Sequence, residues 1–198
     1  VSLKKLGETA LQGVKQASEI AVPTAACGII IGVVIQSGLA TKVSKLIANV
    51  GSSYLIIALL ITMLGCMLLG MALPTVAAYL VANVLFVPTL IGLNIQPLQA
   101  NMFVFYFGIM AQITPPVCVA SFTAAGIAGA DSMKTGLTGF AYALVAFLVP
   151  FIFIYDPSIL LVGTPLEIVK GTLILFLGTY LLASGMAGFF LVPLNRIE

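Results

Sequence analysis

The sequence contains no histidine and very few charged residues, which make up 7% of its 198 residues. From Leu46 to Ala130 no charged side chain occurs at all. A soluble domain needs charge to cover its surface, so this composition excludes an ordinary soluble globular protein. The net charge of +2 and the scattered basic residues give no indication of nucleic-acid binding.

Catalytic groups are also scarce. The charge-free region offers no carboxylate pair, no histidine and no nucleophile beside a base, so we do not expect an enzyme. Proton relays within membranes use buried Asp, Glu or His, so a relay is not expected either. Cys27, Cys66 and Cys118 lie singly in apolar stretches, and their odd number and wide spacing speak against disulfides or a metal cluster. We expect them to be small buried residues.

What the sequence has in abundance is apolar side chains: 61% of the residues are hydrophobic and the mean hydropathy is +1.22. A helix needs about 20 apolar residues to cross a bilayer, so the sequence predicts an all-α membrane protein. We expect ordinary crossings at residues 20–39, 135–155 and 169–192. The predicted parts of the chain are an amphipathic interfacial connector (1–19), a scaffold helix with an interfacial arm (20–52), an interrupted region (53–130) and C-terminal transmembrane helices (131–198). The connector pattern is explained equally by the tail of a preceding transmembrane helix.

The apolar segment at residues 53–90 is too long for a single crossing. As one helix it would be about 57 Å long, whereas the hydrocarbon core of a bilayer is roughly 30 Å thick. The strong helix breaker near its middle is the sequence from Ala72 to Thr75, which contains Pro74. We therefore predict a re-entrant helical hairpin whose tip stays inside the protein, with two ordinary crossings as the alternative. A simple proline kink is the more conservative interpretation of Pro74.

A second interruption lies within residues 101–130, at Thr114, Pro115 and Pro116. Two consecutive prolines remove two backbone donors, and we expect the carbonyls of Ile113 and Thr114 to lose their helical partners. The result would be a discontinuous helix, with free carbonyls at the end of one half and free amides at the start of the other. Polar backbone opened at membrane depth is tolerated only where it is buried in protein or lines a cavity. The two interruptions are therefore the predicted functional site.

The groups available at this site are neutral. Opened backbone carbonyls suit a hard cation such as Na⁺, helix N-termini suit a carboxylate, and paired interrupted segments are typical of a transporter site. The neutral polar side chains near the interruptions are Thr75, Asn83, Asn101, Gln112 and Thr114. Asn83 is also explained as a polar group that packs helices together. Gly65, Gly70 and Gly108 would permit close approach of neighbouring backbones.

Four motifs occur in a specific order: GMALPTVAAY at 70–79, ITPPV at 113–117, AAGIAGAD at 124–131 and PFIFIYDP at 150–157. Together they resemble the large membrane subunit of tripartite ATP-independent periplasmic (TRAP) transporters. The resemblance covers residues 20–160 and is closest to the branch in which the small and large membrane subunits are fused in one polypeptide.

The resemblance implies a half-repeat of the ion-transporter superfamily, here the C-terminal repeat with a re-entrant helical hairpin and a discontinuous helix. It implies a secondary active permease of a bacterial or archaeal inner membrane that takes up an organic acid by Na⁺ symport and an elevator movement. The implied partners are the lipid bilayer, the remaining half of the same permease with its small-subunit part, and a periplasmic substrate-binding protein of the TAXI type.

The resemblance also implies site residues. The expected Na⁺ ligands, mostly through backbone oxygens, are Gly70, Ala72, Thr75, Gln112, Thr114 and Val117. The expected substrate-binding residues are Met71, Leu73, Pro74, Thr75, Pro115 and Pro116. Many large subunits have an acidic residue where this chain has Pro74, so the number of oxygen ligands differs here. A hypothesis of another class is a non-transporting membrane scaffold or assembly subunit, which predicts no ion-linked stabilisation. A channel would need a continuous polar stripe, and neither interrupted element shows one.

Overall fold

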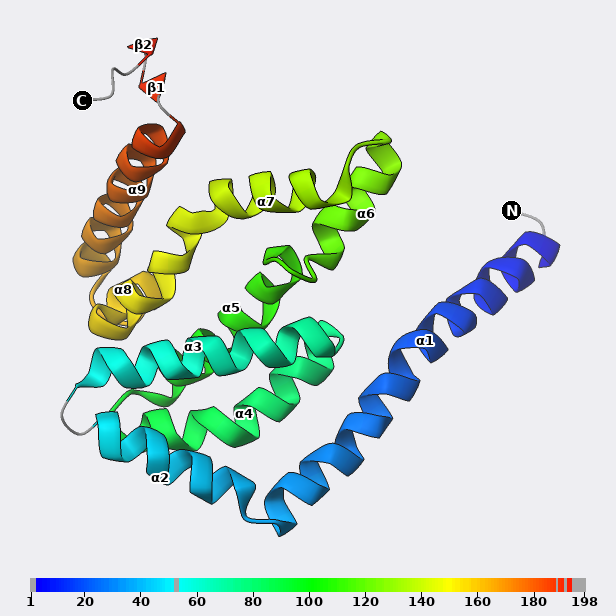
Figure 1. Ribbon diagram of the computed structural model, residues 1–198, viewed down its shortest axis with the longest axis horizontal. Coiled ribbons are helices and arrows are strands. Elements are labelled where there is room, and N and C mark those ends of the chain that lie inside the picture. Colours follow the sequence, from blue (N-terminus) through cyan, green and yellow to red (C-terminus); the bar gives the residue numbers. More distant parts are fainter. Residues whose placement is uncertain (1–2, 52–53, 188, 191, 194–198) are drawn as a thin grey trace.

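The computed structural model describes residues 3–51, 54–187, 189–190 and 192–193. This part of the chain is helical apart from two strands of two residues each near the C-terminus (Figure 1). In chain order the elements are α1 (Leu3–Gln36), α2 (Leu39–Gly51), α3 (Leu55–Ala72), α4 (Thr75–Gly92), α5 (Pro97–Met110), the 3₁₀ helix η1 (Ala111–Ile113), α6 (Val119–Ala128), α7 (Ser132–Ala143), η2 (Leu144–Leu148), α8 (Val149–Tyr155), η3 (Pro157–Leu160), α9 (Pro165–Ala187), β1 (Phe189–Phe190) and β2 (Val192–Pro193).

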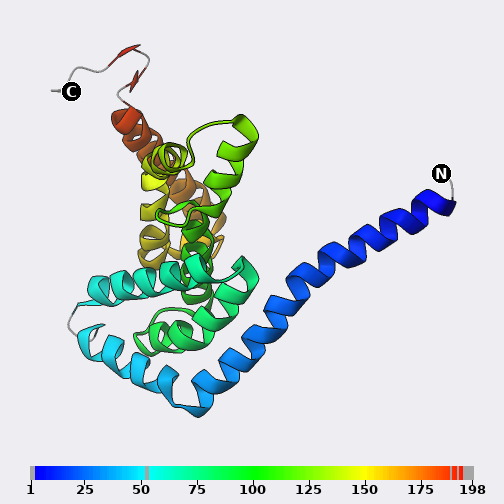
Figure 2. The ribbon, with the colours of Figure 1, turned by 45° about the vertical axis from the view of Figure 1, so that its right-hand side comes forward.

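The N-terminal helix α1 is continuous over 34 residues. It includes most of the connector expected at 1–19 and most of the crossing expected at 20–39, without a break between them. Gly38, with φ +67°, forms the turn into α2, and Ala25–Gln36 is bent by 66° against Leu39–Asn49. Figure 2 shows the first half of α1 extending away from the other helices, while α1 contacts them through α2 and α4.

Helices α3 and α4 form an antiparallel hairpin that turns at Leu73 and Pro74, which confirms the predicted break. Leu73 has extended backbone (φ −126°, ψ 152°), as expected for a residue that precedes proline, and so the helix ends at Ala72. The two arms approach closely because Gly65 has no side chain. A Cβ atom at that position would overlap the ring of Phe86.

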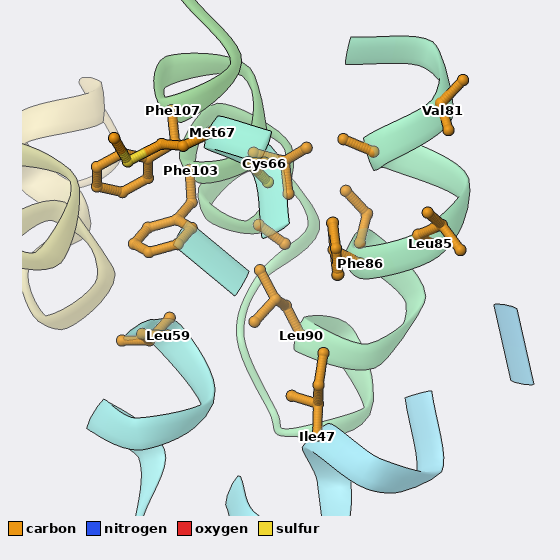
Figure 3. Close-up of a cluster of buried hydrophobic side chains, with 14 of the residues drawn as sticks. Ile47, Leu59, Cys66, Met67, Val81, Leu85, Phe86, Leu90, Phe103 and Phe107 are labelled. Carbon is orange, nitrogen blue, oxygen red and sulfur yellow. The ribbon is translucent and has the colours of Figure 1, made fainter. Parts of the chain in front are cut away.

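The hydrophobic core lies between α2, α3, α4 and α5, and α8 covers one side of it. Figure 3 shows side chains from the first four of these helices meeting in one cluster. Phe103 and Phe107 of α5 are fully buried and contact Phe151 of α8 edge to face, with ring centroids 5.4 and 5.8 Å apart. Such pairs contribute about 0.5–1.5 kcal/mol beyond burial. This packing fixes α5, the first half of the interrupted helix, beside the hairpin.

The crossing expected at 135–155 is divided into α7, η2 and α8, with the irregular part just before Pro150. Proline has no N–H to donate to the carbonyl of Ala146 four residues earlier. That carbonyl instead accepts the backbone N–H of Val149 and the hydroxyl of Tyr106 on α5, the latter at 3.1 Å. The irregular segment before Pro150 is therefore a tightened 3₁₀ turn, and Tyr106 of α5 stabilises it.

Among the residues that the structure describes, three helical stretches are long and apolar enough to cross a membrane: Thr75–Gly92, Ser132–Tyr155 and Pro165–Met186. The bent pair of α1 and α2 adds a fourth if it is one span, and Leu55–Met71 and Val119–Ala128 are shorter apolar helices. The last crossing, expected at 169–192, is α9, which begins earlier and ends at Ala187. Within the described residues the chain is thus an all-α membrane protein.

Candidate functional site

The tip of the hairpin presents the carbonyl end of α3. The carbonyl of Leu69 accepts the N–H of Leu73 at 3.1 Å, and the next carbonyl, that of Gly70, accepts a side-chain amide instead of a backbone N–H. Helix α4 then begins at Thr75, and the carbonyl of Pro74 accepts the N–H of Ala78 at 2.9 Å. Helix ends leave backbone carbonyls and amides without helical partners, so this turn brings carbonyl oxygens and amide groups together.

The second interruption separates η1 from α6, at the position that the sequence predicts. Thr114 is extended (φ −100°, ψ 124°) because it precedes Pro115, just as Leu73 does before Pro74. Its hydroxyl donates to the carbonyl of Met110 at 2.7 Å, and its N–H donates to that of Ala111 at 3.2 Å. The Thr114 side chain, 5% exposed, therefore closes the end of the first half-helix.

One expectation about this break is wrong. The carbonyl of Thr114 does not lack a partner, because it accepts the N–H of Cys118 at 3.2 Å. The chain turns back through Pro115, Pro116 and Val117, and this turn returns the amide of Cys118 to the carbonyl four residues earlier. The carbonyls whose helical donors the prolines remove are those of Ala111 and Gln112, four residues before each proline.

The two interruptions lie against each other. The side-chain amide Nε2 of Gln112 donates to the carbonyl of Gly70 at 3.1 Å, a contact between residues far apart in the sequence. A Cβ atom on Gly70 would lie 2.6 Å from both the Cβ of Ala111 and the carbonyl oxygen of Gly108, so only glycine fits there. The end of α3 therefore packs directly on the last turn of α5 and on η1.

Of the residues predicted as Na⁺ ligands, Gly70, Gln112 and Thr114 lie at or directly beside this contact. Ala72 and Thr75 lie on the two sides of the hairpin turn, and Val117 lies in the turn before α6. Among the predicted substrate-binding residues, Met71, Leu73 and Pro115 are half-buried, whereas Pro74 and Pro116 are exposed. These last two prolines lie on the surface of the chain beside the packed contact.

A hydrogen-bond network that the sequence analysis did not predict connects α4 to α5. The hydroxyl of Tyr79 donates to Oδ1 of Asn101 at 3.1 Å, and Nδ2 of Asn83 donates to the same oxygen at 2.6 Å and to Tyr79 at 3.2 Å. Nδ2 of Asn101 donates to the carbonyl of Pro97 at 2.7 Å. Tyr79 and Asn83 are four residues apart and share one helix face, a spacing that offered a signal. The network confirms the packing interpretation of Asn83.

A second buried polar contact ties the start of α5 to the end of α8. Nε2 of Gln99, a residue 5% exposed, donates to the carbonyls of Phe153 and Ile154 at 2.7 and 3.0 Å. Its Oε1 accepts the backbone N–H of Gln96 at 3.2 Å. One side chain therefore caps two helix ends and ties α5, the first half of the interrupted helix, to α8.

Cavities are found elsewhere in the described part of the chain. One of about 630 Å³ is found where η3 meets α9, and none of the residues predicted for the site lines it. In the described part of the chain no group of three or more Cys, Asp or Glu side chains comes together as a metal cluster. The side chains at the two interruptions are uncharged, so the oxygen atoms available there are those of backbone carbonyls, hydroxyls and amides.

Fold and site together define an all-α, multi-pass membrane protein with two interrupted segments in contact. Comparison with known families identifies it further: the family described as "Tripartite ATP-independent periplasmic transporter, DctM component" matches residues 1–168. The chain belongs to this family and is a permease component of a TRAP transporter. The match covers every residue of both interruptions. No curated protein and no solved structure matches the chain.

Proposed function

We propose that this chain contributes the cation-binding interruptions of a secondary active permease that couples Na⁺ entry to the uptake of an organic acid. The observation that carries the proposal is the hydrogen bond from Gln112 to the carbonyl of Gly70, which joins the hairpin tip to the broken helix. Paired interrupted segments in contact are typical of transporter sites, since their opened backbone replaces the water shell of an ion.

The neutrality of the region supports Na⁺ over a proton as the coupling ion. No charged or histidine side chain occurs from Leu46 to Ala130, so nothing there titrates near neutral pH as a proton relay would. The proposed ligands are carbonyl, hydroxyl and amide oxygens of Gly70, Ala72, Thr75, Gln112, Thr114 and Val117. Binding of the cation would draw the end of α3 and the turn after η1 together and neutralise their carbonyl dipoles.

The start of α4 supplies the complementary feature for an organic anion. The first amides of a helix and its positive dipole end attract a carboxylate, and Thr75 begins α4 directly beside the hairpin tip. The proposed substrate contacts are Met71, Leu73, Pro74, Thr75, Pro115 and Pro116. A cation at the neighbouring carbonyls would add attraction for the same carboxylate, which couples the two binding events.

The remaining features of the proposal rest on the family. A tripartite transporter works with further components, here proposed to be a small membrane subunit, fused in the same polypeptide, and a periplasmic binding protein of the TAXI type. The chain would be the C-terminal repeat of an inner-membrane permease in a bacterium or archaeon, moving its site by an elevator motion. Transport activity would belong to the complete permease.

The test is uptake of radiolabelled organic acids by the complete permease in proteoliposomes, with its binding protein, at graded Na⁺ concentrations. Thr75→Val and Thr114→Val remove one hydroxyl each and should raise the Na⁺ concentration for half-maximal uptake about tenfold. Thr123→Val is the matched control. The Thr123 hydroxyl donates to the carbonyl of Val119 four residues earlier, as the Thr114 hydroxyl does to that of Met110, but Thr123 lies within α6.

The control should leave the Na⁺ dependence unchanged. If Thr75→Val and Thr114→Val behave like Thr123→Val, the cation site is not at these interruptions. If the purified complete permease shows no thermal stabilisation by Na⁺ relative to K⁺ and no Na⁺-dependent uptake, the scaffold hypothesis is favoured over transport.

A further inference from the structure

Two adjoining cavities flank the first half of α9, away from the interruptions. The larger, about 630 Å³, is lined by charged as well as apolar side chains and lies at the connection between α8 and α9. The smaller, about 200 Å³, is an apolar groove that runs between α8 and α9. The two adjoin each other, because Asp156, Gly171 and Ile174 line both.

The position of these cavities relative to the membrane follows from the helices around them. They lie where the candidate span Ser132–Tyr155 ends and the candidate span Pro165–Met186 begins. A charged connection between two spans lies at the level of the lipid headgroups. The groove follows α9 from Gly171 to Leu182, a length of about 16 Å, which is half of the roughly 30 Å hydrocarbon core. The groove therefore has the depth of one leaflet.

The wall of the groove is apolar and open. A Cβ atom at Gly178 would meet nothing within 4 Å, so the absence of a side chain there leaves space between α9 and α8. The hydroxyl of Thr179 donates to the carbonyls of Leu175 and Phe176 at 2.8 and 3.1 Å and so offers no unmet polar group to the groove. Such a surface suits a hydrocarbon chain.

The larger of the two cavities carries charges of both signs. Asp156 accepts the N–H of Ser158 through Oδ1 at 3.0 Å, and Glu167 accepts the N–H of Thr164 through Oε2 at 2.8 Å. Each carboxylate retains a second oxygen that can accept from another donor. Lys170 lines the same cavity and contributes an ammonium group. Two carboxylates and one ammonium around one space are complementary to a ligand that has an ammonium and a phosphate.

We propose that the two cavities bind one phospholipid with a primary ammonium headgroup, phosphatidylethanolamine, with an acyl chain in the groove. The ammonium donates to Asp156 and Glu167, and the phosphate pairs with Lys170. Phosphatidylglycerol has no ammonium and meets two carboxylates of its own sign, while the quaternary headgroup of phosphatidylcholine has no N–H donor. The site is therefore selective among lipids, and it is independent of the cation proposal.

Native mass spectrometry of the complete permease, titrated with equal amounts of phosphatidylethanolamine, phosphatidylglycerol and phosphatidylcholine, tests this proposal. The expected result is retention of one phosphatidylethanolamine at least fivefold above the other two lipids. The double variant Asp156→Asn, Glu167→Gln keeps both backbone caps, since amide oxygens accept the same N–H groups, and should abolish the preference. Lys170→Gln should weaken retention, whereas Lys42→Gln, at an exposed lysine of α2, should not.

The groove is tested separately with glycine variants of α9. Gly178→Leu places a side chain in the groove and should reduce lipid retention at least fivefold. Gly185→Leu is the matched control, because it adds the same side chain to the same helix, again with nothing within 4 Å, at a residue that lines neither cavity. Equal retention of the three lipids, equal effects of the two glycine variants, or no retained lipid because another part of the permease covers the groove would each overturn the proposal.

Discussion

The side-chain amide of Gln112 donates to the carbonyl of Gly70 across the two interruptions, at 3.1 Å. The donor lies in the 3₁₀ turn that ends one half-helix, and the acceptor lies two residues before the end of the hairpin arm. A carbonyl at a helix end can accept this bond because the helix no longer supplies its donor. Because the bond uses Nε2, Oε1 is the atom of Gln112 that we propose as a cation ligand.

Replacing Gln112 tests whether this bond sets the geometry of the site. Gln112→Met keeps the length of the side chain but removes the amide, and should lower stability by about 1 kcal/mol and raise the Na⁺ requirement of uptake severalfold. The measurements are the melting temperature of the complete permease with and without Na⁺, and uptake at graded Na⁺. Gln12→Met, at an exposed position of α1, should change neither.

Gly70 should tolerate no side chain. In Gly70→Ala the new methyl would lie 2.6 Å from Ala111 and from the carbonyl oxygen of Gly108, so α3 must move away from α5. Overpacking of this kind costs about 1–3 kcal/mol, and the shift should also abolish Na⁺-dependent uptake. Gly126→Ala, where nothing lies within 4 Å, is the control in the same scan of melting temperature and uptake. Full activity in Gly70→Ala would mean that the close contact is dispensable.

The positions of both interruptions could be predicted from the sequence because they depend on local chemistry. The helical region is disfavoured for a residue before proline, and Leu73 and Thr114 leave it, whereas Val149 before Pro150 stays helical. The sequence also indicated a close approach of backbones at the hairpin tip, because Gly70 has no side chain to keep a neighbouring helix away. The predicted cation and substrate roles of these residues stay predictions.

Features that depend on tertiary partners could not be predicted in the same way. By contrast, the carbonyls whose helical donors the two prolines remove, those of Ala111 and Gln112, follow from helix geometry alone, so the expectation for Thr114 was wrong for a local reason. The 3₁₀ turn before Pro150 depends on the hydroxyl of Tyr106, from a different helix. The predicted boundary between residues 19 and 20 was placed where the composition changes from mixed to apolar, whereas α1 continues through it as one helix. Periodicity alone carries no information on such partners.

The network at Asn101 should contribute measurably to the docking of α4 on α5. Tyr79→Phe removes one donor but keeps the ring against Phe105, with which it packs edge to face. Hydrogen bonds between membrane helices contribute on average about 0.6 kcal/mol, so a small fall in melting temperature is expected. Asn101→Ala removes three bonds and should have a larger effect, and the double variant should add only the loss of the bond from Asn83 to the Tyr79 hydroxyl. Tyr142→Phe, 75% exposed, is the control.

Gln99 should be more sensitive, because its amide caps two buried carbonyls at once. Gln99→Leu has a similar volume but leaves the carbonyls of Phe153 and Ile154 without this donor. Each buried polar group left without a partner costs about 1–3 kcal/mol, so we expect a large fall in the melting temperature. Hydrogen exchange should rise at the end of α8 and at the start of α5, and remain unchanged in α9. A uniform rise would instead indicate general unfolding.

The contact between the hairpin arms predicts a compensating pair of substitutions. Gly65→Ala alone should destabilise the hairpin, since the added methyl overlaps the ring of Phe86. Phe86→Leu alone should also destabilise it, by the loss of a buried ring that is 6% exposed. In the double variant the smaller side chain leaves room for the methyl, so the combined loss in melting temperature should be less than the sum. Strict additivity would show that Gly65 and Phe86 do not touch in the complete permease.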